Sequence, residues 1–165
     1  MTRKQATGDY LIVFFIVLTI MFSGTFVCAQ SEIRLSKGQT VYVPLYSHIY
    51  FGDRETPLYL AGTLSIRNTD PANAIIVLEA DYYDTNGKLI RKYVDKPIRL
   101  NQMVSTRFVV KESDDRGGSG ANFVVKWKAD QTVNAPIIES IMIGTKAQRG
   151  ISFTSRGQVI KEEGR

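Results

Sequence analysis

The stretch that decides the fold is LYLAGTLSIRNTDPANAIIVLEADYYDTNGKLIRKYV, residues 58–94. Near its start, Leu58, Leu60, Leu64 and Ile66 alternate with polar or small residues. This period of two places one apolar row on one face of a β-strand. The stretch as a whole predicts three β-strands joined by two polar turns.

Two turn signals divide this stretch. Asn68–Pro71 ends the first strand, because proline donates no backbone hydrogen bond and Asn and Asp favour turns. Asp84–Gly87 is a hairpin signal, since an Asn-Gly pair adopts positive φ at little energetic penalty. The second and third strands are therefore expected over residues 75–83 and 89–94.

The same alternation continues along the chain. Phe123, Val125 and Trp127 share one face of a strand, and we expect Trp127 to be the largest core residue. Pro44 suggests an edge strand or a bulge. Residues 47–57 are expected to form a long connection, and further strands are expected over residues 40–46, 98–100, 104–111, 123–129, 136–145 and 151–160, the last interrupted at Gly157.

This pattern of short strands, without an amphipathic helix after the N-terminal segment, predicts an all-β fold. The strands should form an antiparallel two-sheet β-sandwich of immunoglobulin-like type, with a barrel as the alternative. A hydrophobic content of 44% and a charged content of 22% are sufficient for a packed core. The net charge of +5 is dispersed along the chain, which argues against a nucleic-acid partner.

An uncharged apolar segment begins the chain. Arg3 and Lys4 precede residues 10–28, which we expect to form a hydrophobic helix of a secretory signal peptide cleaved after Ala29. The helix could instead remain as an uncleaved membrane anchor. Lipid attachment at Cys28, the single cysteine of the chain, is a third alternative.

These features predict four parts of the chain and an exported location, either periplasmic or secreted, or anchored by the N-terminal helix. The absence of cysteine after residue 28 excludes an intrachain disulfide. The parts are a signal peptide or anchor over residues 1–29, a spacer over 30–38, a β-sandwich domain over 39–160, and a charged tail over 161–165.

Six segments of the chain are informative as a set. They are VYVPLYSHIY (41–50), LSIRNTD (64–70), DYYDTNGKLIRKYVDKPI (81–98), STRFVVKESD (105–114), GGSGANFVVKW (117–127) and ISFTSRGQVI (151–160). The strings GGSGANF and SRGQ are distinctive within them. Together these segments resemble the bacterial domain-of-unknown-function family numbered 3124, and the resemblance implies a bacterial exported protein and no defined activity. A second, shorter likeness links the DYYD strand and the following NGK to exported immunoglobulin-like modules.

Catalytic chemistry would depend on His48, the single histidine. A triad would require His48 to meet an acid such as Asp53 or Asp81 and a nucleophile such as Ser119. Ser119 lacks the G-x-S-x-G context of a nucleophile elbow. A small exported hydrolase using His48 with an acidic partner is therefore the alternative function, and packing of His48 among aromatic residues is the favoured interpretation.

Two loops could bind small ions. Consecutive N–H groups of Gly117–Gly120 could form an anion-binding nest beside Arg116, although a strain-relieving glycine loop is favoured. Acidic residues 112–115 could bind calcium weakly, although a solvated loop is favoured. We therefore expect no cofactor and no metal site.

The sequence thus favours a non-catalytic, exported binding module of the cell envelope. Its partner would be an envelope protein, a glycan or a small anionic ligand. The aromatic residues near residues 42–59 could line a groove for such a partner, although core packing is favoured for them. The candidate binding residues are Tyr46, His48, Tyr50, Asp53, Arg54, Arg116, Gly117, Gly118, Ser119, Asn122, Arg156 and Gln158.

Overall fold

The computed structural model describes residues 34–145 and 150–163. These residues form strands and connecting turns with no helix among them, which confirms the predicted all-β fold with antiparallel sheets. No helix in these two ranges is long and apolar enough to cross a membrane. The N-terminal segment 1–29, with its expected hydrophobic helix and Cys28, lies outside the described residues.

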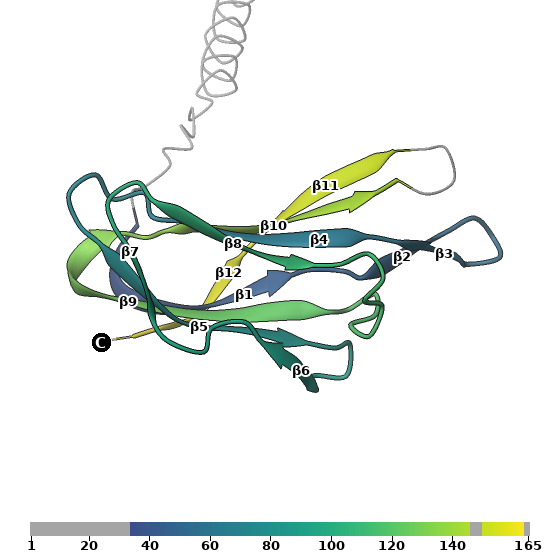
Figure 1. The fold of residues 1–165 in the computed structure, drawn as a ribbon, viewed down its shortest axis with the longest axis horizontal. Helices are drawn as coiled ribbons and strands as arrows, with labels where there is room; N and C mark the ends of the chain where they lie inside the picture. The colour runs from purple at the N-terminus through teal and green to yellow at the C-terminus, as the bar shows by residue number, and fades with distance from the viewer. Residues whose placement is uncertain (1–33, 146–149, 164–165) are drawn as a thin grey trace, which may run out of the picture. The chain divides into compact units, whose positions relative to one another are not determined.

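Most strands belong to two antiparallel sheets (Figure 1). The larger has the order β12-β1-β9-β5-β6, with β7 also paired to β5, and we call it the large sheet. The other, the small sheet, has the order β11-β10-β4-β8. The large sheet comprises β1 (Leu35–Pro44), β5 (Ile75–Tyr83), β6 (Leu89–Lys92), β7 (Ile98–Leu100), β9 (Asn122–Asn134) and β12 (Gln158–Glu162). The small sheet comprises β4 (Ala61–Arg67), β8 (Ser105–Val110), β10 (Ile137–Gly144) and β11 (Ile151–Arg156).

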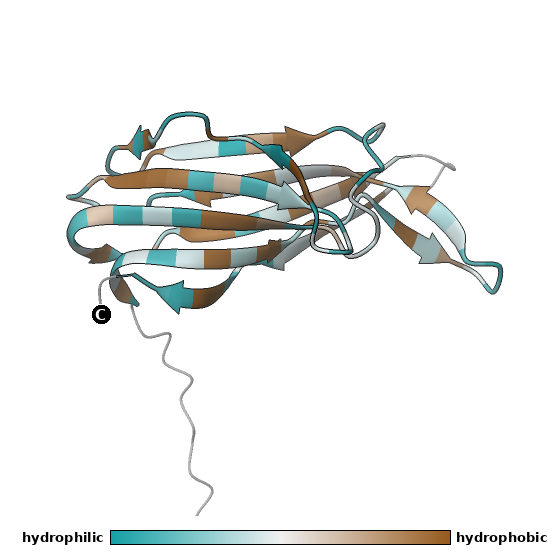
Figure 2. Ribbon diagram, turned by 90° about the horizontal axis from the view of Figure 1, so that it is seen from below, coloured by the Kyte–Doolittle hydropathy of each residue, from teal (hydrophilic) through white to brown (hydrophobic). Residues whose placement is uncertain are grey.

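The core is built from alternate side chains of both sheets. Phe123, Val125 and Trp127 of β9 are fully buried, as predicted, and Leu64 and Ile66 of β4 belong to the same hydrophobic cluster. Figure 2 shows hydrophobic and hydrophilic residues alternating along the strands. The period of two therefore identified the buried face correctly.

Gly157 is the point where the chain passes from the small sheet to the large one. Before it, β11 pairs with β10, and after it, β12 pairs with β1. A Cβ atom at Gly157 would lie 2.7 Å from Cγ1 of Val41 and 2.8 Å from the carbonyl oxygen of Ile138. The chain can cross here because glycine has no side chain, so the predicted interruption joins the two sheets.

The turn after β4 is fixed by a buried carboxylate. Oδ1 of Asp70 accepts hydrogen bonds from the backbone N–H groups of Ala72 and Asn73, at 2.9 and 2.8 Å. Oδ2 accepts one from the backbone N–H of Asn134, at 2.9 Å. These bonds lower the pKa of Asp70, with the bond from Asn134 contributing most. The predicted turn therefore also links β4 to the end of β9.

The first and last described strands extend beyond the predicted domain. β1 begins at Leu35, inside the range 30–38 that was assigned to a spacer, and Ser36 is buried. The Ser36 hydroxyl donates a 2.7 Å hydrogen bond to Oε2 of Glu162, in the predicted tail 161–165. The polar composition of both segments hid their pairing, because cross-strand hydrogen bonds leave no apolar pattern.

Two expectations need correction. β1 lies between β12 and β9 and is not an edge strand, and its register shifts fall at Ser36/Gly38 and Thr40/Val41, whereas Pro44 is its last residue. Residues 47–57 are not an irregular connection, because they contain β2 (His48–Phe51) and the start of β3 (Thr56–Tyr59). These two strands pair with each other as a separate two-stranded sheet, the β2–β3 hairpin.

Candidate functional site

The predicted binding residues do not form a single site. One group lies on the β2–β3 hairpin or beside it, a second forms the loop before β9, and a third flanks Gly157. The first group contains Tyr46, His48, Tyr50, Asp53 and Arg54, the second Arg116, Gly117, Gly118, Ser119 and Asn122, and the third Arg156 and Gln158.

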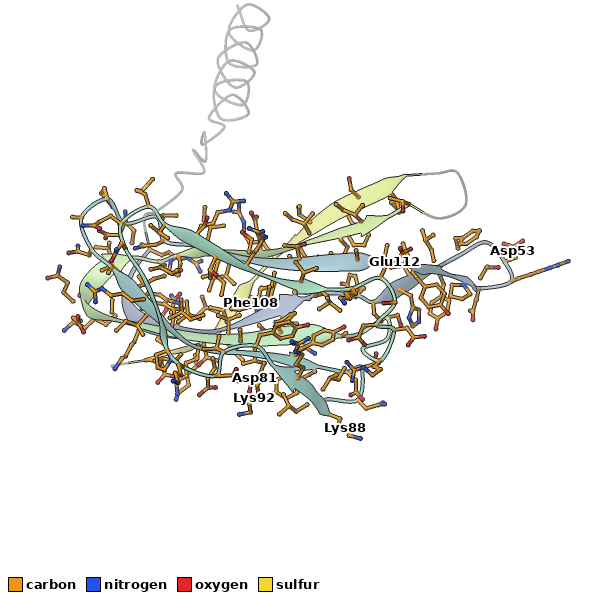
Figure 3. The ribbon with its side chains drawn as sticks, viewed as in Figure 1. Asp53, Asp81, Lys88, Lys92, Phe108 and Glu112 are labelled. Atoms are coloured by element: carbon orange, nitrogen blue, oxygen red, sulfur yellow. The ribbon has the colours of Figure 1, made fainter. Side chains whose placement is uncertain are left out.

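The β2–β3 hairpin projects beyond the ends of the neighbouring strands (Figure 1). Tyr50 is 54% exposed and Phe51 is 51% exposed, although both are large apolar residues within a strand. Asp53 lies at the end of the hairpin, away from both sheets (Figure 3), and Arg54 next to it is exposed. The hairpin thus displays two aromatic side chains beside an acid and a base.

His48 packs among tyrosines at the base of this hairpin. Its Nε2 atom lies 3.1 Å from the hydroxyl of Tyr50, within hydrogen-bond distance. Its ring contacts the rings of Tyr50 and Tyr59 edge-on, with centroids 5.2 and 6.0 Å away. Its Nδ1 atom is buried and has no hydrogen-bond partner among the described residues. This geometry matches the favoured interpretation of an aromatic-packed histidine.

Tyr46 and a small depression lie near the base of the hairpin. Tyr46 is half-buried and packs against Phe153, with ring centroids 6.2 Å apart, so much of its ring belongs to the core rather than to a free surface. A depression of about 200 Å³ lies at the base of the hairpin and is lined by Tyr59, Glu112, Ser113 and Asp115. Figure 3 shows Glu112 in this part of the molecule, between the sheets and the hairpin.

The glycine loop before β9 packs against the domain instead of forming an open nest. The N–H of Gly118 donates a 2.8 Å hydrogen bond to Oγ of Ser47, and the N–H of Gly120 donates one of 3.0 Å to Oγ1 of Thr85. A Cβ atom at Gly117 would lie 2.0 Å from the Tyr82 hydroxyl. These two N–H groups already have acceptors within the fold, so two of the four proposed donors of an anion-binding nest are engaged by protein groups.

Arg116 and Asn122, at the two ends of this loop, also have structural contacts. Nε and Nη2 of Arg116 donate hydrogen bonds of 2.7 Å to the two carboxylate oxygens of Asp114. These bonds from Arg116 lower the pKa of Asp114. Asn122 begins β9 and pairs with Pro44 of β1 and Tyr83 of β5. Ser119 between them is exposed.

Asp114 also belongs to the acidic segment 112–115 that was considered for calcium. Its carboxylate is held by Arg116, which reduces the charge available to a cation. Within residues 34–145 and 150–163, no group of three or more metal-ligating side chains is placed to hold an ion.

The last group is divided between the two sheets. Arg156 ends β11 and lies opposite Glu139 of the small sheet. Gln158 begins β12 and lies opposite Tyr42 of the large sheet. The two residues therefore belong to different surfaces, although one residue separates them in the sequence.

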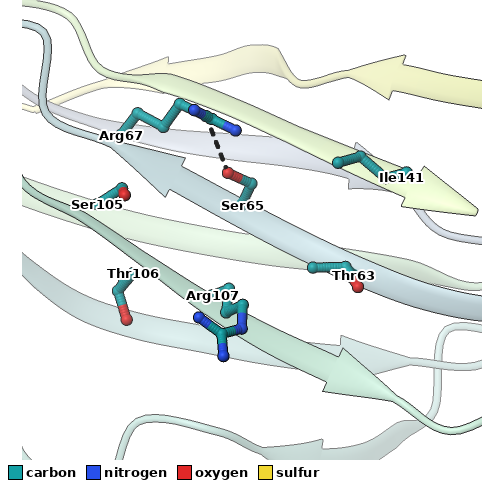
Figure 4. Close-up of a pocket in the computed structure, with 7 residues that line it drawn as sticks. All are labelled: Thr63, Ser65, Arg67, Ser105, Thr106, Arg107 and Ile141. Carbon is teal, nitrogen blue, oxygen red and sulfur yellow. Dashed lines mark hydrogen bonds between the residues drawn. The ribbon is translucent and has the colours of Figure 1, made fainter.

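A polar depression lies on the outer face of the small sheet, and none of its lining residues was among the predicted site residues. It has a volume of about 270 Å³ and is shown in Figure 4. Its residues lie on β4, β8 and β10, which are far apart in the sequence. The alternation along β4 and along β8 could have indicated which residues of each strand face outward. The sequence could not show that the two strands are neighbours. The lining residues are Thr63, Ser65, Arg67, Ser105, Thr106, Arg107 and Ile141.

Comparison with known proteins identifies the family. No curated protein matches the chain. A solved structure described as the crystal structure of Thermotoga maritima 1070 is similar, with 10% sequence identity and a TM-score of 0.44, covering 75% of this chain and 96% of that chain. A family model described as "Protein of unknown function (DUF3124)" matches residues 38–160. The chain therefore belongs to the DUF3124 family, as the six resembling segments predicted.

Proposed function

We propose that this chain is an exported, non-catalytic binding module of the bacterial cell envelope, and that it contacts another envelope protein through the β2–β3 hairpin. The observation that carries the proposal is the hairpin itself. Among the described strands, β2 and β3 pair with each other and with no strand of either sheet. A two-stranded hairpin on its own is at best marginally stable in water. We therefore expect the β2–β3 hairpin to be stabilised when a partner packs against it.

The exposed side chains of the hairpin suit a protein partner. Tyr50 and Phe51 supply large, amphipathic or apolar contact area of the kind enriched at protein interfaces. The outer edges of β2 and β3 carry backbone N–H and C=O groups, and an added strand could pair with them. Asp53 and Arg54 at the tip offer polar contacts that would orient the partner.

The rest of the domain supports the hairpin as a rigid base. We infer an immunoglobulin-like β-sandwich, because two antiparallel sheets contribute to a single hydrophobic cluster. Gly157 joins the sheets by a strand that passes from one to the other. Such a scaffold holds an exposed binding element in place without a catalytic centre.

Export is inferred from the N-terminal sequence. The basic residues Arg3 and Lys4, the apolar residues 10–28 and the small residue Ala29 follow the order of a secretory signal. Cleavage would release a periplasmic or secreted domain, and retention would anchor the domain to the membrane. Sequencing of the mature N-terminus distinguishes these outcomes, since a start at Gln30 supports cleavage.

The geometry at His48 does not favour the hydrolase alternative. A catalytic histidine needs hydrogen-bond contact with both an orienting acid and a nucleophile or water. Here the Nε2 atom contacts Tyr50, and the ring lies between two tyrosines. We therefore assign His48 to the support of the hairpin.

A photocrosslinking amino acid placed at Tyr50 of the full-length protein tests the hairpin assignment in intact cells. The matched control places the same amino acid at Lys88, which is exposed on a different hairpin (Figure 3). We expect a discrete protein adduct from position 50 that is absent from position 88. Equal adducts from both positions, or none from position 50, would contradict the proposal.

A further inference from the structure

The basic residues of the two sheets differ in kind. Within the strands of the small sheet they are Arg67, Arg107 and Arg156, and there is no lysine. The strands of the large sheet carry mainly lysines instead, at positions 37, 92, 126, 128 and 161. Arginine has a planar fork of donors that matches carboxylate oxygens two at a time, whereas lysine acts as a point charge.

Two arginines of the small sheet, Arg67 and Arg107, lie beside hydroxyl groups. In the strand register, Arg67 of β4 lies beside Ser105 of β8, and Ser65 of β4 lies beside Arg107 of β8. Two arginines and two serines therefore form a compact square on one outward face, and Thr63 extends it along β4. Figure 4 shows these side chains around the depression of about 270 Å³.

The charge of this surface is incompletely balanced. Glu139 is the one acidic residue within the strands of the small sheet, all of which the structure describes. Its Oε1 lies 3.8 Å from Nε of Arg67, and its strand partner on the other side is Arg156. Among the described residues, no carboxylate forms an ion pair with Arg107. Arg107 is thus the cation best placed to meet an incoming anion.

Arg67 is held in position before any ligand arrives. Its Nε donates a 3.2 Å hydrogen bond to Oγ of Ser65, drawn as the dashed line in Figure 4. Its contact with Glu139 further limits the side chain. A side chain that is already oriented loses less conformational entropy on binding. The terminal guanidinium nitrogens of Arg67 can still donate to a ligand.

We propose that this depression binds a carboxylated sugar unit. Arg107 would receive the carboxylate, Arg67 would donate hydrogen bonds to ring hydroxyl groups, and Ser105 and Thr63 would both donate to and accept from them. Ile141 supplies an aliphatic surface for the C–H groups of the ring. The volume falls just below the range of about 300–1,000 Å³ typical of drug-sized ligands, which fits one small polar unit of a longer chain. This surface is distinct from the β2–β3 hairpin, so it goes beyond the function proposed above.

Calorimetric titration of the full-length protein with oligogalacturonate tests the site. The protein is kept in a polyoxyethylene detergent, which contains no sugar. We expect saturable binding that is at least about tenfold weaker in the R107Q variant, because bonds to charged groups contribute most. R107K, which keeps the charge and loses the fork, should also bind more weakly. R99Q is the matched control, since Arg99 is an exposed arginine of the large sheet.

The same titrations define the source of the ligand. Tighter binding of the oligomer than of free galacturonate would support a polysaccharide chain, and equal binding would support a single free sugar acid. Equal binding of a maltooligosaccharide, or full displacement by equimolar inorganic phosphate, would overturn the assignment. So would an equal loss in R107Q and R99Q, or the absence of saturable binding.

Discussion

The β2–β3 hairpin and the two sheets are built from similar residues but bury them very differently. Phe123 in β9 is fully buried in the hydrophobic core, whereas Phe51 in β2 is half exposed. Both are aromatic residues in regular antiparallel strands. The difference lies in what covers them, because both sheets contribute to one hydrophobic cluster, whereas β2 and β3 pair only with each other among the described strands. The sheets should therefore determine stability, and the hairpin should determine contact with other molecules.

The largest expected effect is in the core of the large sheet. Trp127→Ala removes a fully buried indole and should lower the free energy of unfolding by about 3–5 kcal/mol. Urea denaturation followed by circular dichroism measures this change. A loss below about 1 kcal/mol would show that the sheets do not carry the stability we assign to them.

The crossing between the sheets should be almost as sensitive. Gly157→Ala introduces a Cβ atom within 2.8 Å of the Ile138 carbonyl oxygen, and overpacking of this kind destabilises by about 1–3 kcal/mol. Gly150→Ala is the matched control, because its Cβ would meet nothing within 4 Å. Thermal unfolding should separate the two variants. Equal midpoints would contradict the close packing at Gly157.

A smaller, pH-dependent effect is expected at Asp70. Its pKa in the folded protein lies below the ordinary value of 3.8, so its carboxylate stabilises the fold above that pH. This contribution is lost as the pH falls through the lowered pKa. Asp70→Asn should therefore destabilise the protein at pH 7, and the difference from the unmodified protein should shrink below pH 3.8. Denaturation measured across this pH range checks the sign, and a constant difference would refute it.

The smallest effect on stability is expected on the hairpin. Tyr50→Ser changes an exposed side chain and removes its contact with His48, so it should alter the free energy of unfolding by no more than about 1 kcal/mol. With the crosslinking amino acid placed at position 51, the Tyr50→Ser variant should form much less of the protein adduct than the same protein with Tyr50 intact. If Tyr50→Ser destabilised the protein as strongly as Gly157→Ala, the hairpin would belong to the core and the contrast would fail.

The sequence was informative wherever one face of a strand is buried. Alternation identified the core faces of β4 and β9, and Asn86-Gly87 identified a turn in which Gly87 has a φ of 78°. The β2–β3 hairpin could not be recognised in this way, because Tyr50 and Phe51 are both exposed and leave no period of two. A pattern of burial predicts only those strands that are covered.

The candidate sites were harder to predict for a different reason. Gly117 and Gly118 suggested an anion-binding loop, but Ser47 and Thr85, both distant in the sequence, use the N–H groups of this loop. Conversely, Arg67 and Arg107 are neighbours because β4 and β8 pair, and the sequence does not show this pairing. Such contacts depend on strand order, which local sequence does not encode.

The crossing of the chain from the small sheet to the large sheet at Gly157 also affects how the protein folds during synthesis. β1 is the first of the described strands to leave the ribosome. One of its edges lacks its strand partner until β12 is synthesised. Val41 pairs with Val159, which is synthesised more than a hundred residues later. A nascent chain interrupted before that point would expose an unpaired strand edge to chaperones, proteases and other nascent chains.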